Sequence, residues 1–164
     1  MFKHLFIAFL FSFNLVFSQD LSCVQYTTHE GLPSNQVYNI FQDKNGFVWF
    51  ATDRGIVSFD GNKFNKYDKK NGLPSSTVFR FYPQINGDVW CSTFSNKWFY
   101  FNPDNLIFKL YSFNDSVVKY SNGALNENLY ISDDGTVNVG FQTHSGVLSI
   151  SAKGDVIQSI DGYF

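Results

Sequence analysis

The chain has 164 residues, of which 20% are aromatic, and a formal net charge of −2. This length suits about one ordinary domain. A mildly acidic chain without a cluster of Lys or Arg lacks the basic surface that nucleic-acid binding requires, so we expect no nucleic-acid partner.

Residues 1–18, MFKHLFIAFLFSFNLVFS, have the pattern of a secretory signal peptide. Lys3 and His4 form a short basic start, an apolar run follows, and Val16 and Ser18 suit the two selective positions of a cleavage site. The apolar stretch is shorter than the roughly 20 residues that a membrane span needs. We therefore expect cleavage before Gln19, and a mature protein in the periplasm or at the extracellular face of the cell envelope.

A repeat dominates the rest of the chain. Gly31-Leu32-Pro33-Ser34 returns 41 residues later as Gly72-Leu73-Pro74-Ser75. At the same offset, Val37 corresponds to Val78, Asn45-Gly46 to Asn86-Gly87, Val48-Trp49 to Val89-Trp90, and Thr52 to Thr93. Self-similarity at a period of about 40–50 residues indicates an array of identical supersecondary units.

The first unit, residues 32–71, contains four strand-like runs at 37–42, 47–52, 56–59 and 63–67. Turn sequences separate them, and Asn45-Gly46 readily supplies the positive φ of a tight hairpin. Four short strands and their turns in about 40 residues predict one blade of a β-propeller.

The second unit, residues 73–112, repeats this plan with runs at 77–82, 88–93, 97–101 and 107–111. The third, residues 121–164, is degenerate: it follows a longer connection and has Asn138 at the tryptophan position. No helix-period pattern of useful length is evident after the leader. We therefore predict an all-β fold: a partial β-propeller of about three four-stranded antiparallel blades, spanning residues 19–164 after the signal peptide.

Three blades do not close a ring, because propellers close with typically 4–8 blades. We expect the chain to be the N-terminal part of a longer protein, in which further blades cover the open faces. Residues 19–164 alone are expected to associate or aggregate, since open blade faces and strand edges favour association.

The string GLPSNQVYNIFQDKNGFVWFATDRGIVSFDGNKF resembles the two-component regulator propeller repeat, and the second unit resembles it more loosely, with Gln84 and Asn96 as departures. The signature positions are Gly31, Leu32, Pro33, Asp43, Gly46, Trp49, Thr52 and Gly55 in the first unit, and Gly72, Leu73, Pro74, Gly87, Trp90 and Thr93 in the second.

The resemblance implies a function. Proteins with these repeats are usually sensors, in which an exported propeller precedes a membrane span and a cytoplasmic histidine kinase or other output domain. The resemblance therefore implies the periplasmic ligand-sensing segment of a two-component sensor, with a glycan as one candidate ligand and a homodimer as the candidate state of the full-length protein. The alternatives are the N-terminal part of an exported hydrolase or lyase, and a secreted interaction module.

Trp49 and Trp90 recur at a fixed strand position, which favours packing between blades. Both are also candidates for facing a ligand, since aromatic faces suit the apolar surfaces of sugars. Asp43 and Asp53 flank a strand at hairpin ends, where Asp usually caps turns, rather than forming an acid/base pair. We predict no catalytic residues in this segment.

Two cysteines, Cys23 and Cys91, are too few and too far apart to suggest a zinc site. An exported protein meets an oxidising compartment, so a disulfide stays open as an alternative to two free thiols. No metal or cofactor is predicted.

Overall fold

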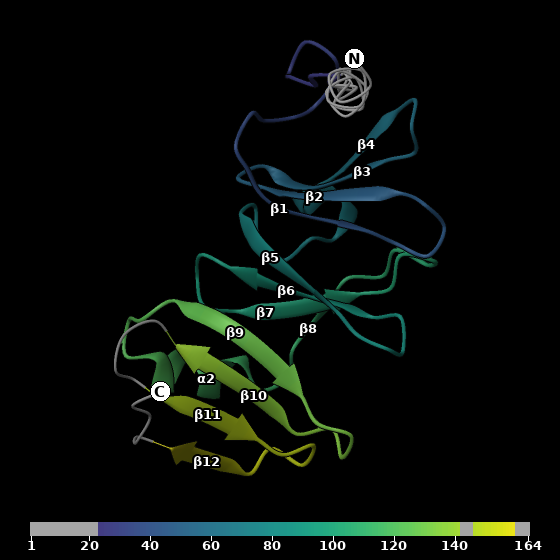
Figure 1. Cartoon of the computed structure of the whole chain (residues 1–164). Coiled ribbons are helices and arrows are strands. Elements are labelled where there is room, and N and C mark those ends of the chain that lie inside the picture. The colour runs from purple at the N-terminus through teal and green to yellow at the C-terminus, as the bar shows by residue number, and fades with distance from the viewer. Residues whose placement is uncertain (1–22, 142–145, 160–164) are drawn as a thin grey trace, which may run out of the picture.

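The structure, a computed structural model, describes residues 23–141 and 146–159. The expected signal peptide lies outside the described residues. Three four-stranded antiparallel sheets follow one another along the chain (Figure 1). This arrangement confirms the predicted all-β fold and its partial propeller of three blades.

Each blade is a meander in which strands that are consecutive in sequence pair with one another. The strands of blade 1 are β1 (Val37–Gln42), β2 (Val48–Thr52), β3 (Gly55–Phe59) and β4 (Phe64–Tyr67). Those of blade 2 are β5 (Val78–Pro83), β6 (Val89–Thr93), β7 (Trp98–Phe101) and β8 (Lys109–Leu110). Those of blade 3 are β9 (Asn126–Ile131), β10 (Val137–Phe141), β11 (Val147–Ile150) and β12 (Val156–Ser159).

The sequence repeat reappears as a repeat of strand register. In blade 1, Val37 pairs with Thr52 and a bulge follows before Asn39. In blade 2, Val78 pairs with Thr93 and the same bulge follows. At the first bulge, the Asn39 side-chain oxygen accepts a hydrogen bond from the Phe81 amide at 3.1 Å, which joins the first strands of the two blades.

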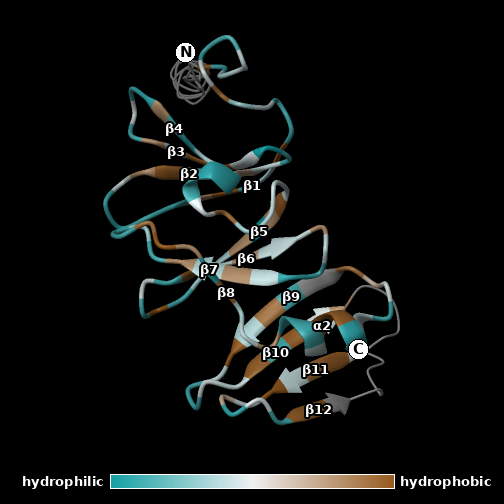
Figure 2. Cartoon of the chain, turned by 180° about the vertical axis from the view of Figure 1, so that it is seen from behind, coloured by the Kyte–Doolittle hydropathy of each residue, from teal (hydrophilic) through white to brown (hydrophobic). Residues whose placement is uncertain are grey.

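Blade 2 packs against both neighbours because successive strand residues point to opposite faces. Cys91 and Phe99 lie in the core shared with blade 1, whereas Trp90 and Trp98 lie in the core shared with blade 3. All five residues of β6 are buried. Figure 2 shows blade 2 between the other two blades.

Short helical segments connect the blades, although no helix-period pattern of useful length is evident in the sequence. A helix, α2 (Asn114–Ser121), connects blades 2 and 3, and a short 3₁₀ helix, η1 (Lys69–Asn71), connects blades 1 and 2. Two turns are too short for a helical period to stand out in a sequence.

Tertiary contacts hold α2 in place. The Asn114 amide accepts from the Trp98 backbone N–H at 2.6 Å and donates to the Trp98 carbonyl at 2.7 Å. Asn114 thus continues the hydrogen bonding of β7 beyond the end of β8. The strand β8 has two residues, whereas the sequence predicted a strand of five residues at 107–111. Val117 is fully buried in the core between blades 2 and 3.

Both cysteines are free in the structure, Cys23 on the surface and Cys91 in the core of blade 2. Burial raises the pKa of the Cys91 thiol well above its usual value. That thiol is therefore protonated and unreactive while blade 2 is folded.

We predict that Gly55→Ala is much more destabilising than Gly61→Ala. Both glycines have positive φ, at 112° and 96°, a region that costs a non-glycine residue about 1–2 kcal/mol. A methyl group at position 55 would also collide with the backbone carbonyl of Tyr67 on β4, whereas the space at position 61 is empty. Thermal and urea unfolding should show an extra loss of at least about 2 kcal/mol for Gly55→Ala. Equal losses would contradict the tight packing of β3 on β4.

Candidate functional site

The turns of blades 1 and 2 are clamped together at their junction. Lys44 follows β1 and Asp104 follows β7, and the Lys44 ammonium contacts the Asp104 carboxylate at 2.7 Å. The Asn45 amide donates to the other carboxylate oxygen at 3.1 Å. Their mutual hydrogen bond and attraction raise the pKa of Lys44 and lower that of Asp104, so both groups stay charged at neutral pH. The cavity beneath this clamp measures about 260 Å³.

Asp43 organises the turn that carries Lys44. One carboxylate oxygen accepts the backbone N–H groups of Asn45 and Phe47, at 2.9 and 3.1 Å. The other accepts the indole N–H of Trp49 at 2.8 Å. Trp49 is only 2% exposed and lies in the core between blades 1 and 2. Asp43 therefore caps the turn and fixes the tryptophan.

The other signature residues also build turns and core. The Thr52 hydroxyl donates to the Gly55 carbonyl at 2.8 Å, and the Thr93 hydroxyl donates to the Lys97 carbonyl at 2.7 Å. Leu32 and Leu73 are buried, and each is followed by a half-buried proline, Pro33 and Pro74. Gly31, Gly46, Gly55, Gly72 and Gly87 have positive φ.

The second junction, between blades 2 and 3, departs from this plan. Gln84 lies one repeat after Asp43, and its side chain donates to the Tyr82 carbonyl at 2.9 Å. Ile85 lies one repeat after Lys44 and is fully exposed. Uncharged residues thus replace both Asp43, which fixes Trp49, and Lys44, which pairs with Asp104.

A cavity of about 550 Å³ occupies the second junction. It is lined by the β5–β6 turn, the 111–113 segment before α2, the β9–β10 turn and the start of the β11–β12 turn. Its polar lining residues are Gln84, Asn86, Asp88, Ser112, Ser132, Asp133 and Ser151. We take this concave site, called the junction cavity below, as the candidate functional site, because aromatic pockets with a few convergent polar groups are typical of ligand sites.

One wall of the junction cavity is a connected set of aromatic rings, of which Trp90 and Tyr111 are 8% and 9% exposed. The Trp90 and Tyr100 rings stack with centroids 5.0 Å apart, and the edge of Tyr111 meets Trp90 at 5.1 Å. Phe113 meets Tyr111 at 5.6 Å. The Tyr111 hydroxyl is buried and has no hydrogen-bond partner among the described residues. Burial raises the pKa of Tyr111 to about 12, so the hydroxyl is neutral at physiological pH.

Blade 3 contributes small and polar groups to the site. Asn138, at the tryptophan position of this blade, accepts a hydrogen bond from the Ser149 hydroxyl at 2.6 Å and donates to Ser132 at 3.2 Å. A methyl group on Gly154 would overlap the ring of Phe113, so the β11–β12 turn packs closely on the aromatic wall. Asn138 lies on the face of β10 opposite to Val137 and Val139, which pack on blade 2. The polar groups that blade 3 places in the cavity lining are Ser132, Asp133 and Ser151.

The structure separates the two sequence-predicted ligand candidates. Trp49, 2% exposed, borders a cavity of about 280 Å³ at the first junction, whereas Trp90, 8% exposed, is part of the junction-cavity wall. Sequence reasoning did not single out Tyr100, Tyr111, Asp88 or Asp133. The available signal was the pair of departures from the repeat at positions 84 and 85, because these positions lie at the edge of the cavity.

Two further observations concern the described residues. No group of three His, Cys, Asp or Glu side chains in this part of the chain is placed to hold a metal ion. No helix within residues 23–141 and 146–159 has the length and apolar character needed to cross a membrane.

Residues 31–54 match the family model of the two component regulator propeller. These residues include the clamped turn and the first signature tryptophan. A comparison with curated proteins found no match.

Solved structures share the fold. Two are extracellular domains of hybrid two component systems from B. thetaiotaomicron: one has 22% identity and a TM-score of 0.62 over 83% of this chain, the other 17% and 0.61 over 88%. The chain spans only 20% and 19% of those structures. Virginiamycin B lyase from Staphylococcus aureus is similar at 16% identity and a TM-score of 0.53, over 75% of this chain and 40% of the lyase. At these identities the likeness concerns the fold alone.

We predict that Asp43→Ala destabilises the protein by about 1–3 kcal/mol, because it leaves the Trp49 indole N–H and two turn amides without their acceptor. The matched control is Gln84→Ala at the same repeat position, which removes a single bond to a backbone carbonyl and should cost less than about 1 kcal/mol. Urea unfolding followed by tryptophan fluorescence measures both losses. A larger loss for Gln84→Ala would contradict the assigned role of Asp43.

Proposed function

We propose that this chain, whose first blade belongs to the two-component regulator propeller family, is the ligand-sensing propeller segment of an exported two-component sensor. The family match at residues 31–54 and the fold shared with extracellular domains of hybrid two component systems support this proposal. The secretory pattern of residues 1–18 supports a location at the periplasmic or extracellular face of the envelope.

The junction cavity is the observation that carries a binding role. Its volume of about 550 Å³ falls within the range of about 300–1,000 Å³ that is usual for small-molecule sites. Its aromatic wall comes from blade 2 and the segment before α2, and its polar lining residues come from both blades. A ligand seated there contacts two blades at once.

A bridging ligand provides a physical route to signalling. A ligand that binds one arrangement of blades 2 and 3 better than another shifts the population toward that arrangement. The cavity lies between blades 2 and 3, so the added contacts act on the second junction. In the full-length sensor, we propose that further blades of the same chain and a homodimer transmit this shift to the output domain.

The test is to block the cavity without disturbing the core. Ser112 is exposed and lines the cavity, whereas Ser76 is exposed in the connection before β5 and lines none of the described cavities. We predict that small molecules found by thermal-shift screening, glycan fragments included, stabilise the protein and the Ser76→Trp control. The same molecules should bind the Ser112→Trp variant at least about tenfold more weakly, because the new indole occupies the junction cavity.

Undiminished binding to Ser112→Trp would place the ligand elsewhere and refute this proposal for the cavity. Chemical conversion of a bound compound, detected by mass spectrometry of the incubated mixture, would indicate an exported hydrolase or lyase instead of a sensor.

A further inference from the structure

We propose that the junction cavity selects a ligand that carries a positive charge, as a protonated amine or a quaternary ammonium group. The inference rests on the proposed function, because it assigns a ligand class to the same cavity. Three features support it: the charges on the cavity lining, the comparison of the two junctions, and the aromatic wall.

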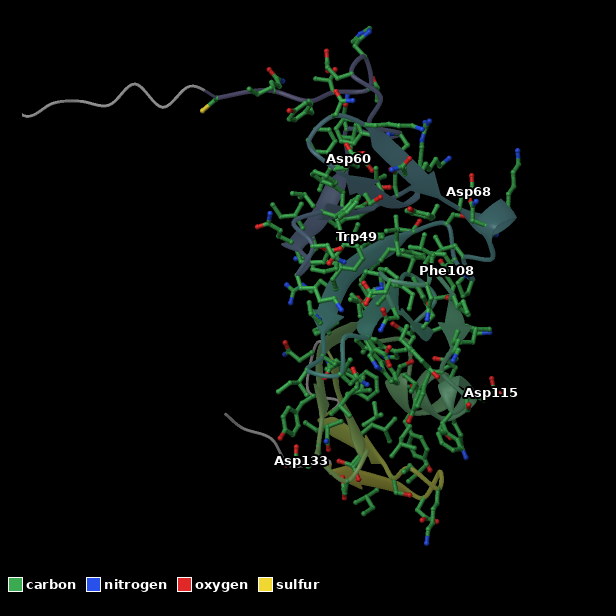
Figure 3. The ribbon with its side chains drawn as sticks, turned by 90° about the vertical axis from the view of Figure 1, so that its right-hand side faces the viewer. Trp49, Asp60, Asp68, Phe108, Asp115 and Asp133 are labelled. Carbon is green, nitrogen blue, oxygen red and sulfur yellow. The ribbon has the colours of Figure 1, made fainter. Side chains whose placement is uncertain are left out.

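The lining is acidic and carries no cation. Asp88 from the β5–β6 turn and Asp133 from the β9–β10 turn line the cavity, and no Lys, Arg or His is among its described lining residues. Figure 3 shows Asp133 at the edge of blade 3, on the side away from Asp115 of α2. The two carboxylates thus come from the two blades that enclose the ligand space.

The first junction shows what is missing from the second. There, the ammonium of Lys44 lies 2.7 Å from the Asp104 carboxylate and balances its charge. One repeat later, the apolar side chain of Ile85 occupies the position of Lys44. Asp88 and Asp133 lie in other turns than Asp104, and with Ile85 at the Lys44 position no cation lies among the described residues that line this cavity. A cationic ligand would balance their charge.

The Asp88 carboxylate is held in position by neutral groups. Its oxygens accept hydrogen bonds from the side-chain amides of Asn86, at 3.1 Å, and Asn102, at 3.4 Å. Amide donors orient a carboxylate without neutralising it, and each oxygen keeps a second lone pair. Asp133 is exposed and faces the cavity from blade 3.

The aromatic wall fits the same ligand class. The faces of Trp and Tyr rings attract cations within about 6 Å, and desolvation strengthens this attraction. Trp90, Tyr100 and Tyr111 form a connected set of rings, and the raised pKa of Tyr111 keeps its hydroxyl neutral. A neutral sugar would stack on this wall as well, so charge is the property that an experiment must isolate.

Choline and 3,3-dimethylbutan-1-ol separate the effect of charge from that of shape, because the two molecules have nearly the same shape and only choline is charged. Titration of the full chain, followed by tryptophan fluorescence and calorimetry, should show choline binding at least about tenfold more tightly. Asp133→Asn, an exposed substitution that leaves the core untouched, should reduce this preference several-fold. Asp88→Asn should do the same, provided that its thermal unfolding is unchanged. The control Asp104→Asn, in the first junction, should keep the full preference.

Equal affinities, or tighter binding of the alcohol, would overturn the cationic class, as would a preference that both cavity substitutions leave intact. Failure of the folded protein to bind either probe would overturn it too. In each case, a screened compound whose binding is lost in Ser112→Trp would still support the ligand site itself, so the two proposals fail separately.

Discussion

The fold depends on the two-sided packing of blade 2. Alternation along β6 and β7 sends Cys91 and Phe99 into one interblade core and Trp90 and Trp98 into the other. Fully burying a side chain of Phe or Val size contributes about 1.5–3 kcal/mol, so each core stabilises its two blades together. A one-residue slip of strand register would exchange the two sets of side chains between the two cores. The bulge shared by the first hairpins of blades 1 and 2 is part of the register that prevents this exchange.

The candidate site lies where the repeat is interrupted. At the first junction, Asp43 fixes Trp49 and Lys44 pairs with Asp104, and two separate cavities of about 260 and 280 Å³ border the paired turns. At the second, Gln84 and Ile85 replace the two charged residues, and the cavity is about twice as large. The same backbone plan thus yields one junction joined by the Lys44–Asp104 pair and one with uncharged side chains at the positions of Asp43 and Lys44.

The repeat made the blades and their hairpins predictable, because turn residues such as Asn45-Gly46 and the alternating apolar residues recur at a fixed spacing. The helix α2 was not predictable from its eight residues, since Asn114 and Val117 stabilise it through contacts with β7 and the second core. The junction cavity was only partly predictable. Trp90 belongs to the repeat, but Tyr111 and Asp133 lie outside the repeated positions, and Asp133 reaches this cavity only through the packing of blade 3 on blade 2.

The central claim is that the second junction, and not the first, receives the ligand. Hydrogen–deuterium exchange with and without a bound screening compound measures this directly at the equivalent turns of the two junctions. We predict that the compound slows exchange at residues 84–88 and 132–135, and leaves exchange at residues 43–47 and 102–105 unchanged. Slower exchange at the first junction, with no change at the second, would contradict it.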